Sequence, residues 1–94
     1  MKKDNFLVVG AGAWGTALSI RLAKNELEVS LTSRDKENLS EIRKTKENKK
    51  YLPGINIPES INIKDEILPC LANTSVVLLC VKSTGFKKIA AELN

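Results

Sequence analysis

The sequence predicts an α/β fold in which helices cover both faces of a doubly wound parallel sheet, and three observations lead to this prediction. Continuous apolar runs at residues 6–9 and 75–81 are typical of parallel strands that are buried on both faces. Stretches with apolar residues at helical spacing alternate with the predicted strands. A glycine-rich loop joins the first strand to the first helix. The strand–helix order, repeated four times, implies right-handed crossovers within one sheet.

The first half of the chain contains two expected strands and two expected helices. Residues 6–9 form the first strand, and residues 14–24 carry an apolar stripe at helical spacing. Residues 27–32 alternate between apolar and polar side chains, which predicts a half-covered second strand. Asp35 is expected to be the N-cap of a polar helix that runs to about Lys49.

The second half begins with an irregular segment, and residues 51–54 (YLPG) form a turn by composition. Residues 61–63 predict a short third strand. A short helix is expected over residues 65–73, provided that it starts late or kinks at Pro69. Residues 75–81 predict a central fourth strand, and residues 86–93 a further helix.

The doubly wound order places the first strand between the second and the fourth. The loop after the fourth strand then faces the glycine-rich loop at the point where ligands bind to such sheets. The four expected strands are about two-thirds of a six-stranded sheet, so the sequence predicts an incomplete domain of this type.

Composition limits the possible functions. The chain has 94 residues, a net charge of +4, two cysteines and no histidine. No stretch approaches the ~20 apolar residues that a membrane span requires, and we expect neither a span nor a secretory signal. The basic residues at 43–50 lack interleaved aromatic residues, which favours a solvated helix face over a nucleic-acid surface. We expect Cys70 and Cys80 to be small buried hydrophobic residues in a reducing cytoplasm.

Residues 10–15 (GAGAWG) match the G-x-G-x-x-G pattern of dinucleotide-binding loops, with a strand before them and a helix after them. Gly10 permits the tight turn out of the strand, Gly12 lets the backbone approach a pyrophosphate, and Gly15 allows the helix to pack closely on the strand. The free N–H groups at the start of the helix then face the phosphates. The sequence therefore predicts a Rossmann-type dinucleotide site.

Three residues after the second strand bear on the choice of nucleotide. Asp35 has roughly the spacing of the carboxylate that binds the ribose 2′-hydroxyl of NAD, although the helix-cap role accounts for it as well. Arg34 can stack on adenine and bind a 2′-phosphate, with Ser33 adding a hydrogen bond. NADP(H) is therefore favoured over NAD(H), and both remain open.

Residues 10–18, Arg34 and residues 48–58 (NKKYLPGINIP) together form a recognisable pattern. It resembles the N-terminal part of bacterial NAD(P)-dependent glycerol-3-phosphate dehydrogenase, and the resemblance spans essentially the whole chain. Because that family is much longer, the resemblance implies that residues 1–94 are a truncated N-terminal dinucleotide-binding domain that lacks a C-terminal helical substrate domain.

The resemblance also implies roles for particular residues. The glycines shape the pyrophosphate loop, and Ser83 lies beside the nicotinamide end of the crevice. Three further residues would contact the cofactor by position: Ala13, Trp14 and Arg34. The chain departs from the family at Lys82, where proline is usual. With a lysine at this position the chain resembles ketopantoate reductases. Under that interpretation Lys82 would face cofactor phosphate or substrate.

The implied activity is hydride transfer between NAD(P)H and dihydroxyacetone phosphate, which gives sn-glycerol 3-phosphate for phospholipid synthesis. The catalytic residues would lie beyond Asn94, so these 94 residues are expected to bind cofactor without turnover. The alternatives are a ketopantoate-reductase-like NADPH enzyme and a non-catalytic NAD(P)-binding sensor module.

The expected partners are the dinucleotide cofactor and, in the longer enzyme, a small phosphorylated substrate. The fourth strand also has a flat, uncharged edge where a fifth strand would pair. This edge predicts self-association of the chain.

Overall fold

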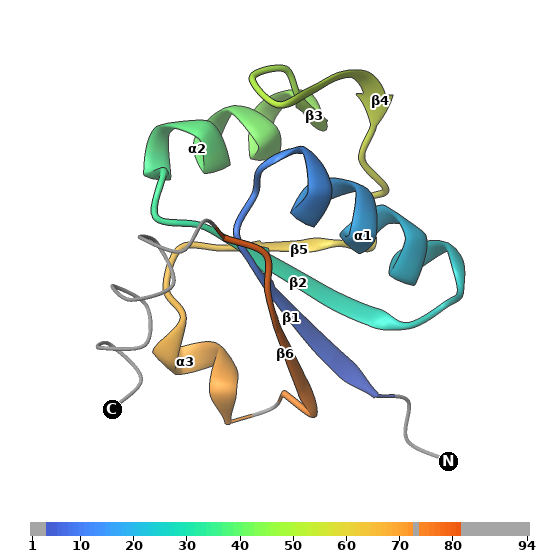
Figure 1. Cartoon of the computed structure of the whole chain (residues 1–94), viewed down its shortest axis with the longest axis vertical. Coiled ribbons are helices and arrows are strands. Elements are labelled where there is room, and N and C mark those ends of the chain that lie inside the picture. Colours follow the sequence, from blue (N-terminus) through green and yellow to red (C-terminus); the bar gives the residue numbers. More distant parts are fainter. Residues whose placement is uncertain (1–3, 73, 82–94) are drawn as a thin grey trace.

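The computed structural model describes residues 4–72 and 74–81, and it places four parallel strands in one sheet (Figure 1). Across the sheet the strands follow the order β5 (Asn62–Lys64), β2 (Glu28–Thr32), β1 (Asn5–Val9) and β6 (Val76–Leu79). The first strand thus lies between the second and the last, as predicted.

Helices cover both faces of this sheet, which confirms the doubly wound arrangement. One face packs against α1 (Ala13–Lys24) and α2 (Lys36–Thr45), and the other packs against the short α3 (Leu68–Leu71). In β1, Val8 belongs to the first hydrophobic cluster, whereas Leu7 and Val9 belong to the second. Because successive side chains of a strand point to opposite faces, burial on both faces explains the continuous apolar run.

The register brings the carboxyl ends of three strands to one edge of the sheet. Val9 lies opposite Thr32 in β2 and Leu79 in β6. The chain continues in the same register just beyond the strands: Gly10 N donates to Thr32 O at 2.8 Å, and Cys80 N donates to Val9 O at 2.8 Å. The glycine-rich loop, the loop after β2 and the residues after β6 therefore meet at this carboxyl edge.

Two sequence predictions for the middle of the chain were wrong. The second helix ends at Thr45 rather than near Lys49, because Lys46 adopts a left-handed conformation (φ 58°) and its N–H donates to Ile42 O. The segment predicted as a turn at 51–54 lies largely within a strand. β3 (Glu47–Asn48) pairs antiparallel with β4 (Leu52–Asn56), and the turn between them is at residues 49–51.

The remaining elements agree more closely with the predictions. The third strand is β5, displaced by one residue, and α3 starts late with Pro69 in its first turn, where proline costs no hydrogen bond.

Cys70 and Cys80 are not bonded to each other and are half-buried, and burial raises the pKa of the Cys80 thiol. The helix predicted at 86–93 lies outside the described residues. Among those that are described, no helix is long and apolar enough to cross a membrane.

The left-handed residue that ends α2 leads to a test of the corrected boundary. Lys46→Gly should raise the free energy of unfolding by roughly 0.5 kcal/mol, because glycine adopts this conformation without the steric cost that a side chain incurs. Lys46→Ala is the matched control: it also removes the ion pair with Glu59 but retains a Cβ, so no gain is expected. Urea unfolding measures both variants, and equal stabilities would contradict the boundary.

Candidate dinucleotide site

The glycine-rich loop is packed so closely that two of its glycines have no room for a side chain. Gly10 has φ 114°, and a Cβ there would lie 2.2 Å from Cys80 O. A Cβ on Gly15 would lie 1.9 Å from Gly10 O, so α1 passes directly over the end of β1. These contacts confirm the tight turn at Gly10 and the close packing of the helix at Gly15.

Gly12 differs from the other two glycines because its missing Cβ faces open space. It is the N-cap of α1 with an extended backbone (φ −76°, ψ −170°), it provides no side-chain cap, and a Cβ added there would meet nothing within 4 Å. The first turn of α1 carries no acidic residue. The backbone N–H groups of this turn are therefore available to an anion that approaches Gly12, which is the geometry that a pyrophosphate requires.

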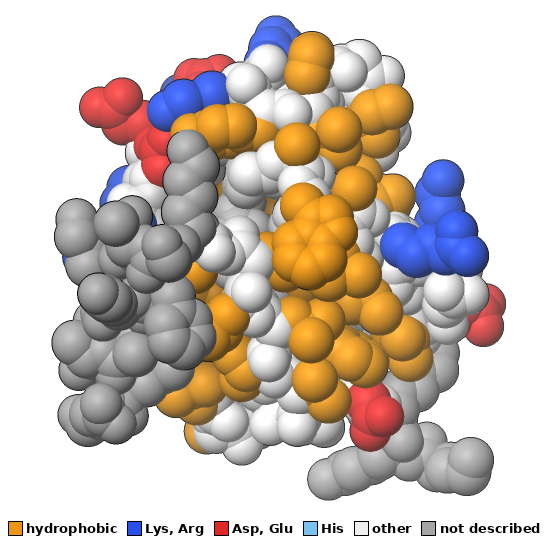
Figure 2. All heavy atoms as spheres, in the orientation of Figure 1, with side chains coloured by type: hydrophobic (Ala, Val, Ile, Leu, Met, Phe, Trp, Pro, Cys, Tyr) orange, Lys and Arg blue, Asp and Glu red, His pale blue; other side chains and the backbone are white. Residues whose placement is uncertain are grey.

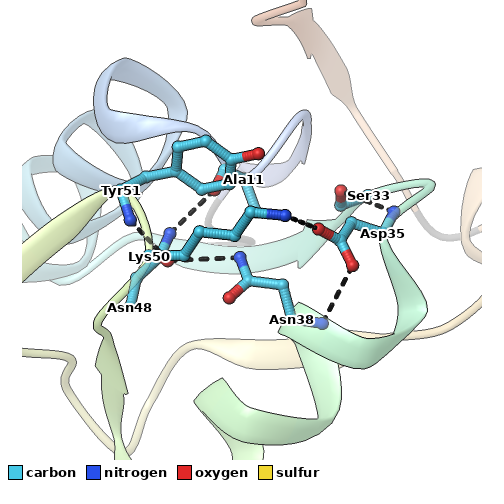
Figure 3. Close-up of polar contacts among 7 residues, drawn as sticks. All are labelled: Ala11, Ser33, Asp35, Asn38, Asn48, Lys50 and Tyr51. Carbon is cyan, nitrogen blue, oxygen red and sulfur yellow. Dashed lines mark hydrogen bonds and ion pairs between the residues drawn. The ribbon is translucent and has the colours of Figure 1, made fainter.

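Asn48 holds the loop in place through a buried network of hydrogen bonds (Figure 3). Its side chain is fully buried, and Nδ2 donates to Ala11 O at 2.7 Å and to Thr16 Oγ1 at 2.8 Å. Its Oδ1 accepts from Asn38 Nδ2 at 3.1 Å and from Tyr51 N at 3.3 Å. The amide thus joins the loop to α1, to α2 and to the β3–β4 turn.

The local sequence does not indicate a role for Asn48. It is the first residue of the 48–58 segment, and no local pattern indicates that an asparagine in such a segment is buried. The described structure shows that this segment and the glycine-rich loop form one hydrogen-bonded unit.

The loop after β2 brings Ser33, Arg34 and Asp35 to the same edge of the sheet. Asp35 is the N-cap of α2, since its Oδ1 accepts from Asn38 N at 3.0 Å, and this confirms the helix-cap interpretation. Ser33 Oγ accepts from Asp35 N at 3.1 Å. Arg34 is exposed, and with Ser33 it lines a hollow beside Lys36, Asp65, Glu66 and Ile67.

Asp35 also forms an ion pair with Lys50 from the β3–β4 turn. Lys50 Nζ lies 2.8 Å from Asp35 Oδ2 and 5.2 Å from the centre of the Tyr51 ring. The hydrogen bond from Lys50 and then the one from Asn38 N lower the pKa of Asp35 below its ordinary value. The same pair raises the pKa of Lys50.

Large hydrophobic side chains are exposed in the first turn of α1 and in the β3–β4 region. Trp14, in the first turn of α1, is 70% exposed, and Tyr51 and Ile55 are also exposed. Figure 2 shows hydrophobic side chains gathered over α1 and the neighbouring β4 region, with lysines and arginines at the rim of the view.

A further hollow of about 410 Å³ lies between α3 and the sheet, where it is lined by Asn5 and Glu28 at the amino ends of their strands. It is separate from the glycine-rich loop.

The structure therefore brings most of the predicted site residues together. Gly10 and Gly12 lie in the loop, Ala13, Trp14 and Gly15 form the first turn of α1, and Ser33 and Arg34 follow the neighbouring strand. Lys82 and Ser83 lie outside the described residues. The described chain reaches Val81, which packs close to Gly10.

A family model now connects this arrangement to known proteins. The model described as the N-terminus of NAD-dependent glycerol-3-phosphate dehydrogenase matches residues 5–94. The chain belongs to this family. The match supports the resemblance noted in the sequence over the ketopantoate-reductase and sensor-module alternatives.

Individual relatives agree with the family match. Glycerol-3-phosphate dehydrogenase [NAD(P)+] of Geobacillus kaustophilus is 37% identical over 91 residues, which cover 97% of this chain and 26% of the relative. The corresponding protein of Geobacillus thermodenitrificans is 40% identical, covering 92% and 25% respectively. The chain thus spans about a quarter of the length of these curated relatives.

Solved structures show the same fold. Glycerol-3-phosphate dehydrogenase from Coxiella burnetii superposes with a TM-score of 0.91 at 28% identity, covering 97% of this chain and 28% of that one. The enzyme from Saccharomyces cerevisiae, at 22% identity, superposes with a TM-score of 0.86 and shares the fold.

The buried amide gives the first prediction for the site. Asn48→Ala should lower the free energy of unfolding by about 2–4 kcal/mol, because Ala11 O, Thr16 Oγ1 and Asn38 Nδ2 lose a buried partner. The exposed Asn56 is the control, and Asn56→Ala should change stability by less than about 0.5 kcal/mol. Similar urea-unfolding midpoints for the two variants would show that the network is not a stabilising element.

The lowered pKa of Asp35 gives a prediction for pH. The unfolded chain binds a proton at this carboxyl near its ordinary pKa of 3.8, whereas the folded chain binds it only at lower pH. The contribution of Asp35 to stability is therefore present above pH 3.8 and is lost as the pH falls through the folded-state value. Between pH 6 and pH 2.5, the free energy of unfolding measured in urea should decrease less for Asp35→Asn than for the unaltered chain. The control is Asp4→Asn, which changes an exposed carboxylate and should behave like the unaltered chain. Identical slopes for all three proteins would refute the prediction.

Proposed function

We propose that this chain is the cofactor-binding domain of an NAD(P)-dependent glycerol-3-phosphate dehydrogenase. The observation that carries the proposal is the structural unit formed by the glycine-rich loop and the 48–58 segment, joined by Asn48 within a chain that matches the family over residues 5–94. The loop has the generic geometry of a dinucleotide site, and the segment is the part of the pattern that discriminates this family from other dehydrogenases.

In this proposal the backbone of Gly12, Ala13 and Trp14 holds the pyrophosphate at the start of α1. The helix dipole and the unpaired N–H groups of the first turn favour a negative group there. Ser33 and Arg34 bind the ribose of the adenosine, and the guanidinium of Arg34 favours the 2′-phosphate of NADPH. When bound, the reduced nicotinamide supplies the hydride, and the domain orients it.

The substrate would be dihydroxyacetone phosphate, which becomes sn-glycerol 3-phosphate when hydride reaches C2 and a proton reaches the carbonyl oxygen. Lys82 and Ser83 lie outside the described residues; the place of Ser83 beside the nicotinamide end of the crevice stays a prediction from the family resemblance, and so does the contact of Lys82 with the cofactor. A general acid and the cations for the substrate phosphate would come from residues outside these 94. The chain by itself should therefore bind cofactor without turnover.

Two further expectations belong to the proposal. Among the described strands β6 pairs only with β1, and self-association through its other edge stays a prediction that sedimentation at high concentration can test. A cytoplasmic location also stays a prediction.

The glycines provide the test of the proposed cofactor site. Gly12→Ala should fold normally, because its Cβ enters open space, but it should weaken NADPH binding at least tenfold by occupying the position of the pyrophosphate. Quenching of Trp14 emission, corrected for absorbance by the nucleotide, measures the dissociation constant, and circular dichroism checks the fold.

Gly15→Ala is the contrasting variant, because its Cβ would collide with Gly10 O and should destabilise the fold itself. If Gly12→Ala binds NADPH as tightly as the unaltered chain, the loop is only a turn. If the unaltered chain binds neither NADPH nor NADH, the proposed function is wrong.

A further inference from the structure

Asp35 follows β2 at roughly the spacing of a carboxylate that binds the ribose of NAD, and both of its oxygens already have partners. Oδ1 accepts from the backbone of α2 at Asn38, and Oδ2 is 2.8 Å from Lys50 Nζ (Figure 3). Because Lys50 and the N–H of Asn38 compensate its charge, Asp35 repels a nearby anion less than a free carboxylate at the same place would.

Lys50 reaches Asp35 because the buried network fixes the turn that carries it. Asn48 is anchored to the glycine-rich loop, and Tyr51 N donates to Asn48 Oδ1, so the turn that carries Lys50 has a defined position. The ammonium lies near the Tyr51 ring as well as the carboxylate. The ion pair therefore spans from the β3–β4 turn to the loop after β2, beside the residues proposed to bind the adenosine ribose.

The surroundings of the pair are rich in negative charge. Lys49 and Lys50 line a hollow together with Asn38 and three carboxylates, which are those of Asp35, Glu37 and Glu41. Without Lys50, this hollow would have a single lysine facing three carboxylates. A ligand that carries a phosphate would meet repulsion there, whereas a neutral ligand would not.

We propose that Lys50 is a specificity residue of the dinucleotide site, and that it permits NADPH binding by neutralising Asp35. This inference rests on the proposed function and assigns the choice of nucleotide to a residue outside the loop after β2. The 2′-phosphate of NADPH carries between one and two negative charges near neutral pH, and an uncompensated Asp35 would repel it. The 2′-hydroxyl of NADH is neutral, and a released Asp35 carboxylate can accept a hydrogen bond from it.

Two adjacent lysines allow a matched test. Lys50→Gln and Lys49→Gln remove the same charge from the same hollow, at exposed positions, but only Lys50 pairs with Asp35. The dissociation constants of NADPH and NADH are measured for both variants at one ionic strength by Trp14 emission. Lys50→Gln should weaken NADPH binding about tenfold and leave NADH binding within twofold, or tighten it, as expected for loss of a charge compensation near a phosphate. Lys49→Gln should weaken NADPH binding less than threefold, as expected for a solvated charge.

A second substitution separates neutralisation from a direct contact of Lys50 with the phosphate. In the Asp35→Asn, Lys50→Gln double variant no uncompensated carboxylate remains at position 35, and asparagine keeps the helix cap. NADPH affinity should therefore return to within about threefold of that of the unaltered chain. Circular dichroism and urea unfolding confirm that each variant is folded at the temperature of the titration.

Three results would overturn the inference while leaving the proposed function intact. These are equal weakening of both nucleotides by Lys50→Gln, equal effects of the two lysine variants, and no recovery in the double variant. Failure of the unaltered chain to bind either nucleotide would instead overturn the proposed function, and the inference with it.

Discussion

The side-chain amide of Asn48 is the contact on which the arrangement of the site depends. A primary amide has two donor hydrogens and one acceptor oxygen, and here Nδ2 donates twice while Oδ1 accepts twice, in a fully buried position. Each of these bonds joins a different segment, so the glycine-rich loop, α1, α2 and the β3–β4 turn share one centre. Because burial strengthens such bonds and penalises their loss, the four segments hold one relative position.

This uncharged centre determines where the charged groups lie at the surface. Lys50 and Tyr51 follow closely after Asn48, and Asp35 begins the helix that also carries Asn38. The surface ion pair between Asp35 and Lys50 is exposed to solvent and contributes little to stability by itself. Its importance comes from its position, because the buried network holds Lys50 beside Asp35 in the loop after β2. In our proposal the interior provides the rigidity, and the surface provides the electrostatic selectivity.

Much of the fold could be predicted because its signals are local. The continuous run in β1, the alternation in β2 and the glycine spacing each report burial or close packing, and the strand order follows from the handedness of crossovers. The end of α2 could not be predicted in this way, because Lys46 is not a residue that usually adopts a left-handed conformation. The β3–β4 pairing was missed because Pro53 and Gly54 suggest a turn, whereas the strand tolerates both at exposed positions. Asn48 was missed because the two acceptors of its Nδ2, Ala11 O and Thr16 Oγ1, are 37 and 32 residues away, and Lys50 was missed because Asp35 is 15 residues away.

The same geometry explains why a glycine pattern alone specifies so little. Gly10 and Gly15 leave no room for a Cβ, because the loop, the residues after β6 and α1 pack closely around them. Any chain that needs this tight strand-to-helix turn has the same steric limits. The carbonyl of Ala11 has a different requirement: it is turned inward and needs a donor, which Asn48 supplies from 37 residues away. A chain that supplies this donor from the β3 segment must also bring the following turn, with its lysine and tyrosine, to the edge of the loop. The glycine-rich loop and the 48–58 segment are therefore physically coupled, and a change in one alters the surface beside the other.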